Sequence, residues 1–99
     1  LCYADANNQA EAGRLGLLAN LQAVLQAHGS VHYTVAAHAC CAVGRVCAGN
    51  GGNQAAAARL GLLADVQMAL RAHAAGHVSV VANACDAVSH LCAGSAANR

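Results

Sequence analysis

The stretch RLGLLA at residues 14–19 recurs without change at residues 59–64, which is 45 positions further along the chain. When the comparison is extended in both directions, residues 8–50 align with residues 53–95 without a gap, and 24 of the 43 aligned pairs are identical. Self-similarity at a fixed period of this size is typical of proteins built by stacking one supersecondary unit. The sequence therefore predicts two copies of a 45-residue unit, at residues 8–52 and 53–97.

The same register continues toward both ends of the chain. Residues 1–2 match residues 46–47 of the first unit, and residues 98–99 follow the second unit. Repeat arrays normally end in atypical units with a polar outer face, which neither end shows. We therefore expect residues 1–7 to be the end of a preceding unit and residues 98–99 to be the start of a following one.

The composition predicts an all-helical fold. The chain has 27 alanines, two tyrosines and no proline, phenylalanine or tryptophan. Alanine and leucine are the best helix formers, whereas strands favour the aromatic and β-branched residues that are scarce here. With so few large side chains, we expect helices that approach closely over alanine-lined faces.

Each unit divides into three expected helices. The first is short, polar and rich in alanine; an asparagine (Asn8 or Asn53) would cap it, and a glycine (Gly16 or Gly61) would end it. The second carries apolar residues at helical spacing, and the third is a longer ladder of valine, alanine and cysteine. We expect these helices at residues 8–14, 17–28 and 33–47, and again at residues 53–59, 62–73 and 78–92.

The cysteines follow the repeat. Cys2, Cys47 and Cys92 are 45 residues apart, and so are Cys40 and Cys85, so that five of the six cysteines occupy two repeat positions. A position that recurs in every unit indicates a space of the same shape rather than a pair of cysteines to be joined. We therefore expect small, buried, reduced thiols in an intracellular, cytoplasmic protein.

The order of a short helix, a glycine, a leucine-rich helix and a long third helix resembles the armadillo repeat. The residues that carry the resemblance are GLLANLQAVL at 16–25, the ladder Val35, Ala39, Ala42, Val43 and Val46, the turn AGN at 48–50, and their counterparts in the second unit. The resemblance implies an all-α, right-handed solenoid of stacked armadillo-like three-helix repeats. HEAT repeats are close relatives and are the alternative assignment.

One armadillo function does not carry over to this chain. In nuclear-import receptors of the family, tryptophan and asparagine on the third helix clamp extended basic peptides. Cys41 and Asp86 stand here at the tryptophan position, and Arg45 and His90 stand at the asparagine position. The resemblance therefore implies a protein-binding array without that cargo.

Polar residues of the expected third helix recur at i, i+4, i+7 and i+11, so they share one helix face. None of them is identical in the two units, although the apolar ladder beside them repeats. In an armadillo stack this face lines the concave groove, which is the usual binding surface. An ordinary solvated face is the alternative, and Asp86 could pair with Arg45 or His90. We call these candidate protein-binding residues the variable stripe: Thr34, His38, Cys41, Arg45, Ser79, Asn83, Asp86 and His90.

Other chemistries find less support in the sequence. His28 and His32, like His73 and His77, are spaced four apart, but a loop is expected between them and no C-x-x-C accompanies them, so we predict no metal and no cofactor. His38 and Cys41 lack an orienting acid and an oxyanion hole, so we predict no enzyme. The net charge is only +1, with no cluster of basic residues and no long apolar stretch, so we expect neither nucleic-acid binding nor membrane insertion.

Two functions remain open at this point. The chain is expected to be a scaffold for other proteins, acting as a structural subunit of a larger complex. The alternative is a receptor that binds peptide cargo in the groove formed by the third helices. The resemblance to alanine-rich armadillo arrays of algae and other protists, some of which are ciliary, further implies a cytoskeletal or ciliary location.

Overall fold

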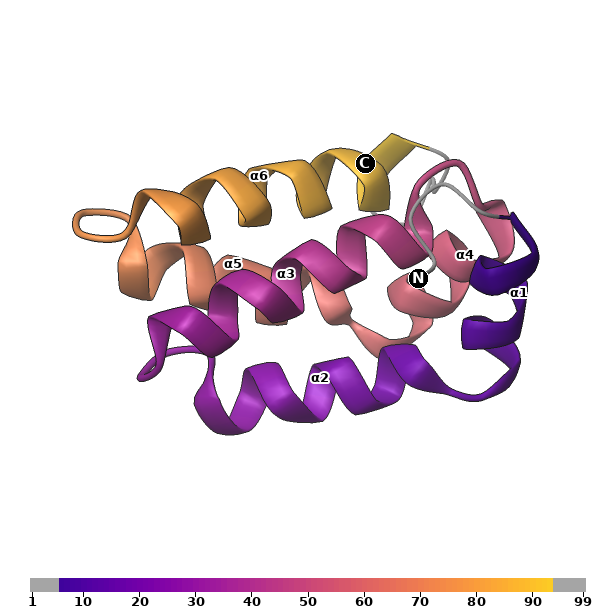
Figure 1. The fold of residues 1–99 in the computed structure, drawn as a ribbon, viewed down its shortest axis with the longest axis horizontal. Coiled ribbons are helices and arrows are strands. Elements are labelled where there is room, and N and C mark those ends of the chain that lie inside the picture. The colour runs from indigo at the N-terminus through magenta and orange to yellow at the C-terminus, as the bar shows by residue number, and fades with distance from the viewer. Residues whose placement is uncertain (1–5, 94–99) are drawn as a thin grey trace.

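The computed structural model describes residues 6–93 and is all-helical over that range (Figure 1). The predicted fold class is therefore confirmed at the level of secondary structure. Most of the expected end of a preceding unit, at residues 1–7, and the expected start of a following unit, at residues 98–99, lie outside the described residues. The helices are α1 (Ala6–Arg14), α2 (Leu17–His28), α3 (Tyr33–Cys47), α4 (Gly51–Leu60), α5 (Leu62–His73) and α6 (Val78–Ala93).

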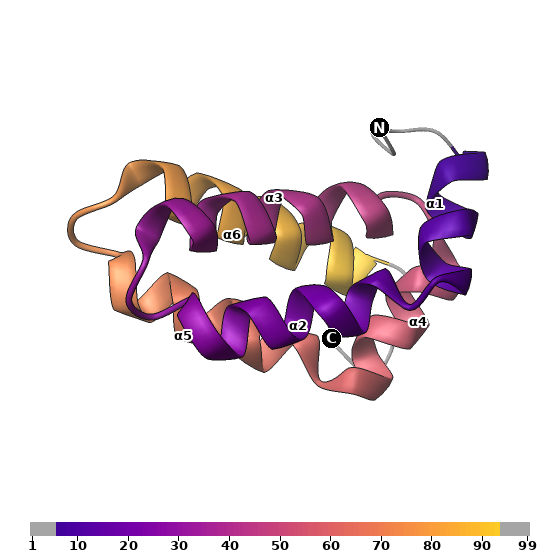
Figure 2. The same ribbon diagram turned by 60° about the horizontal axis from the view of Figure 1, so that its bottom comes forward.

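Corresponding helices of the two units lie side by side. Helix α1 contacts α4, α2 contacts α5, and α3 contacts α6 along most of its length. Helices α3 and α6 form one layer and α2 and α5 form a second, while α1 and α4 lie across one end of both layers (Figure 2). Each unit thus contributes one helix to each part of the molecule.

Two glycines end the first helices as the sequence predicts. Gly16 and Gly61 have φ angles of 74° and 72°, in the left-handed region. Residues with a Cβ atom rarely adopt this conformation, whereas glycine adopts it readily. The chain can therefore turn sharply at this glycine between the first and second helix of each unit.

The predicted cap of α4 is wrong. The helix begins at Gly51, and its N-cap is Asn50, whose Oδ1 accepts a hydrogen bond of 2.9 Å from the Asn53 backbone N–H. Asn53 lies inside α4 and is buried. Helix α1 likewise begins at Ala6, ahead of Asn8. The cause in α4 is that two asparagines stand three positions apart, so that the first can cap the helix and the second is free for another contact.

The core lies between the layers and along the contact between the two units. Its large side chains are fully buried. Small residues lie where α3 and α6 meet: a Cβ atom at Gly44 would be in van der Waals contact with Ala87 Cα, at 3.6 Å. The largest fully buried side chains are Leu25, Leu62, Leu91, Val43, Val46, Val66, Val80, Cys40 and Cys47.

Candidate protein-binding surface

The variable stripe lies at the surface of the layer formed by α3 and α6. On α3, Thr34, His38 and Arg45 are exposed and Cys41 is half-buried. On α6, Ser79 and Asp86 are exposed, while the side chains of Asn83 and His90 are half-buried. All eight side chains therefore remain outside the core and reach solvent to some degree.

The half-buried members on α6 rest against α3 of the first unit. Asn83 Nδ2 donates a hydrogen bond of 3.1 Å to the Ala37 carbonyl. A Cβ atom at Gly44 would lie 3.5 Å from Asp86 Oδ2 and 3.6 Å from His90 Cδ2. The stripe of the second unit thus follows the line of contact between the two third helices, where it meets the surface of the first unit.

Asp86 and His90 form a polar pair within α6. His90 Nε2 lies 3.6 Å from Asp86 Oδ1, at a spacing of four residues along the helix. Two-thirds of the Asp86 side chain is exposed, so the pair lies in water and contributes little to stability. The carboxylate therefore remains available to accept hydrogen bonds from a partner.

The chemistry of this surface suits protein recognition. It combines a guanidinium, two imidazoles, a carboxylate, an amide and two hydroxyls, which donate and accept hydrogen bonds in different directions. These groups come from two rigid helices rather than from loops. Such a surface can match the polar groups of one protein partner, and differences between units can set which partner fits.

The two units are also connected by buried polar residues, which were not identified as functional from the sequence. Asn53 Nδ2 donates to the carbonyls of Gln9 and Val46, both at 2.9 Å. Gln54 Nε2 donates to the Cys47 carbonyl at 3.1 Å. The signal for these roles is present in the sequence, because the two asparagine and glutamine positions are identical in both units.

A carboxylate of the second unit is held by two glutamines of the first. Gln22 Nε2 donates to Asp65 Oδ2 at 2.8 Å and to the Leu60 carbonyl at 2.6 Å. Gln26 Nε2 donates to Asp65 Oδ1 at 3.3 Å. Because both oxygens of Asp65 have donors, its burial between α2 and α5 is compensated.

The histidines join the loops of the two units. His73 Nε2 lies 2.8 Å from the Gly29 carbonyl oxygen, which can only accept a hydrogen bond, so Nε2 carries the proton. The Tyr33 ring stacks on the His77 ring, with centroids 3.9 Å apart. The rings of His28 and His32 are 5.6 Å apart. Among residues 6–93, no three histidine, cysteine or acidic side chains lie close enough together to hold a metal ion.

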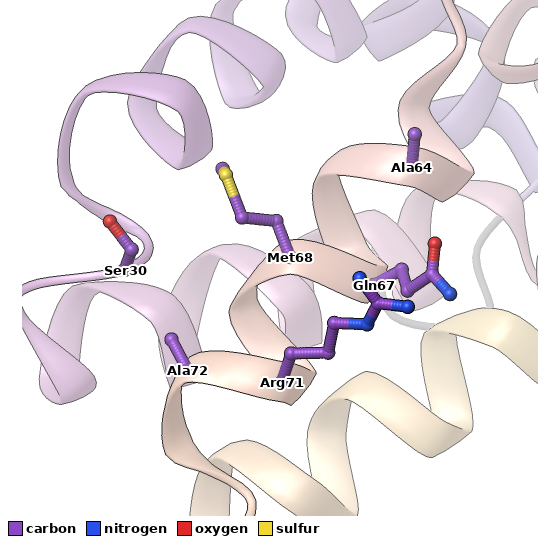
Figure 3. Close-up of a pocket in the computed structure, with 6 residues that line it drawn as sticks. All are labelled: Ser30, Ala64, Gln67, Met68, Arg71 and Ala72. Carbon is purple, nitrogen blue, oxygen red and sulfur yellow. The ribbon is translucent and has the colours of Figure 1, made fainter.

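A shallow hollow of about 370 Å³ lies on the outer face of α5 (Figure 3). Met68 extends toward the side of Ser30 of the first unit, while Gln67 and Arg71 lie beside each other farther from Ser30. Gln67 and Arg71 occupy the repeat positions of the two glutamines that hold Asp65. This face of α5 therefore carries the groups that, in the first unit, bind a neighbouring unit.

The cysteines differ in burial although their repeat positions match. Cys40 and Cys47 are buried, whereas Cys85 is exposed and Cys92 is half-buried, so the expected burial is wrong at Cys85. The reason is that α6 covers the Cys40 side of α3, whereas no described helix covers the corresponding side of α6. Burial raises the pKa of the Cys40 thiol to about 11, with a smaller contribution from Cys41, and burial likewise raises the pKa of Cys47 to about 11.

These thiols are expected to react at very different rates with an alkylating reagent. The thiolate is the reactive form, and an increase in pKa from 9.0 to about 11 lowers its fraction at pH 8 by about a hundredfold. We expect Cys85 to be labelled before Cys40 and Cys47. The labelling rates of Cys40 and Cys47 in the folded chain should be at least about a hundredfold lower than their rates in the chain unfolded by guanidinium. Raising the pH toward 11 should increase their rates. Labelling sites are identified by mass spectrometry; equal rates at Cys40 and Cys85 would contradict the burial.

The described helices are short compared with a bilayer. The longest, α6, has 16 residues, whereas a helix needs about 20 apolar residues to span a membrane. No helix within residues 6–93 is both long enough and apolar enough to cross one.

Comparisons of this chain with protein families, with curated proteins and with solved structures gave no match.

Proposed function

We propose that this chain is a non-enzymatic scaffold for protein–protein interactions, acting as an intracellular structural subunit of a larger complex. In this proposal its two units are part of a right-handed, armadillo-like α-solenoid. Two features of the fold support it. Matching helices lie side by side, and the contacts between units involve side chains such as Asn53 and His73, whose repeat positions hold the same residue in both copies.

The observation that carries the proposal is the separation of constant from variable residues. Residues that repeat, such as Leu25 and Gly16, build the core and the turns. The eight residues of the variable stripe differ between the units and all reach the surface. A helix face that packing leaves free to vary, and that offers donors and acceptors from two rigid helices, is suited to recognise a protein partner.

The experiment removes the charged and imidazole groups of the stripe together. The protein is purified from its native cells, its stoichiometric partner is identified, and binding of that partner to the chain is measured by calorimetry. The variant changes His38, Arg45, Asp86 and His90 to alanine. We expect affinity to fall at least tenfold, because each group is a hydrogen-bonding residue of the proposed interface.

A matched control changes an exposed charged pair on α1. Replacing Glu11 and Arg14 with alanine removes two exposed charged side chains that pair with each other, away from the stripe. This variant should bind the partner with unchanged affinity. If the stripe variant keeps full affinity while folded, the binding surface is elsewhere. If the purified protein instead yields only clients that exchange rapidly, the scaffold proposal is replaced by a peptide receptor.

A further inference from the structure

One side of the second unit is sealed by the first. The apolar side chains that α5 and α6 present on this side have no solvent exposure. In the first unit the same repeat positions line a shallow apolar hollow of about 330 Å³. Val24 is 36 % exposed there, Leu21 and Val35 are half-buried, and Ala39 is buried. We call this surface the leading face; it comprises Leu21, Val24, Val35 and Ala39, which correspond to Val66, Ala69, Val80 and Ala84 of the second unit.

The opposite side shows the reverse pattern. Apolar residues of α2 and α3 are buried against the second unit. At the same repeat positions of α5 and α6, every side chain is half-buried or exposed. We call this surface the trailing face; it comprises Leu63, Leu70, Val81, Cys85 and Val88, which correspond to Leu18, Leu25, Ala36, Cys40 and Val43.

The two faces are therefore the two halves of an interface that the chain already makes once. Where the units meet, a trailing face of the first unit packs on a leading face of the second. The open leading face of the first unit carries, at most positions, the same residue types as the packed leading face of the second. The same holds for the open trailing face of the second unit and the packed trailing face of the first. Their apolar character thus matches in the same order, with a larger side chain on the open faces at Leu21, Val24 and Val81.

The polar contacts of the interface also have counterparts at the open faces. Asp65 accepts from two glutamines across the interface. Asn20 holds the Asp65 position on the open leading face, and Gln67 and Arg71 hold the positions of the two glutamines on the open trailing face. His73 donates to the Gly29 carbonyl, and the matching His28 is exposed on the leading side. An amide in place of the carboxylate still offers an oxygen to both donors.

We propose that the leading face of this chain binds the trailing face of a second copy, head to tail. The second copy continues the packing already present between the two units. An interface of this kind leaves one free face at each end of the assembly, so it produces open chains rather than a closed dimer. Because the proposal involves the apolar faces beside the variable stripe, it stands independently of the proposed partner of that stripe.

The test uses three variants that each add one negative charge. Val24→Asp places a carboxylate on the leading face, and Cys85→Asp places one on the trailing face. Ala64→Asp, the control, places one at a repeat position that the contact between the units leaves exposed, because the matching Ala19 is exposed beside the second unit. Masses are measured by analytical ultracentrifugation from about 1 µM to about 1 mM, because interfaces of modest size associate in this range. Circular dichroism establishes that each variant keeps its helix content.

Head-to-tail binding predicts a distinct set of masses. The unmodified chain and Ala64→Asp should form species larger than a dimer as concentration rises. Val24→Asp and Cys85→Asp alone should each remain monomeric, because each lacks one of the two required faces. An equal mixture of the two should form a dimer and nothing larger, since one intact leading face meets one intact trailing face.

Other masses would overturn the proposal. A chain that stays monomeric at about 1 mM does not use these faces, and a Val24→Asp variant that still self-associates binds like face to like face. A mixture that remains monomeric also contradicts the pairing. If an aspartate variant loses helix content, Val24→Thr or Cys85→Ser takes its place, and association should weaken in the same pairwise manner.

Discussion

Replacing Asn53 with alanine is expected to lower the free energy of unfolding by about 2–4 kcal/mol. The Asn53 Nδ2 group donates to the carbonyls of Gln9 and Val46, both at 2.9 Å, and all three residues lie where the units meet. Removal of the amide leaves two carbonyls without this donor, and a buried polar group that loses its partner costs about 1–3 kcal/mol. Urea unfolding followed by circular dichroism measures the change.

The control for this substitution is Asn20→Ala. Asn20 is exposed on α2, and in dilute protein, where copies do not associate, an exposed change of this kind alters stability by no more than about 0.5 kcal/mol. Both variants make the same chemical change within a helix, so intrinsic helix propensity acts on them equally. If Asn53→Ala also changes stability by less than about 0.5 kcal/mol, Asn53 does not connect the two units.

The same contact can be tested from its other side through Gly13. A Cβ atom at this position would collide with Asn53 Oδ1. Gly13→Ala should therefore destabilise the chain, although alanine is favoured over glycine within a helix by about 1 kcal/mol. In the Asn53→Ala background the collision is gone, so the same substitution should be neutral or stabilising. A cycle with no coupling between Gly13 and Asn53 would contradict the packing.

The helices of this chain are predictable because their signals are local. The spacing of leucine and valine, bounded by Gly16 and Gly61, predicts α2 and α5 over the same residues as the structure. The third helices are equally well placed, with α6 ending one residue later than expected. In each case the deciding residues lie within one or two helical turns of one another, so no knowledge of distant contacts is needed.

The role of Asn53 could not be predicted from its neighbours alone. An asparagine before an alanine-rich stretch is a good helix cap, and Asn50 is another three residues earlier. The choice between them depends on a contact with Gln9, 44 residues away, which holds the Asn53 side chain in the interior. The identity of this position in both units was a signal of that constraint, because exposed caps are more easily exchanged.

The candidate surface was predictable in part for a similar reason. Helical spacing places the stripe on one face of each third helix, and the structure puts all eight residues at the surface. Spacing does not show which neighbour that face meets. Asn83 and His90 therefore rest partly on α3, whereas His38, at the Asn83 position of the first unit, is exposed. The difference arises from the order of the units and not from the local sequence.

Leu25 and Leu70 are identical residues in different surroundings. Leu25 and Leu70 occupy the same repeat position; Leu25 has no solvent exposure, whereas Leu70 is half-buried on the trailing face. Leu25→Ala should lower the free energy of unfolding by about 2–5 kcal/mol, because it leaves a cavity between the units. Leu70→Ala should lower it by about half as much, because water already reaches the side chain and no closed cavity forms.

The comparison also separates packing between units from packing within a unit. Both variants shorten the same side chain in the same kind of helix, so the difference between their losses of stability reports the contribution of the neighbouring unit. Urea unfolding of dilute protein should give the larger loss at Leu25, and at concentrations where copies associate the loss at Leu70 should increase. Equal losses in dilute solution would mean that the second unit adds nothing to the burial of Leu25. The apolar residues of each unit would then be buried by packing within that unit alone.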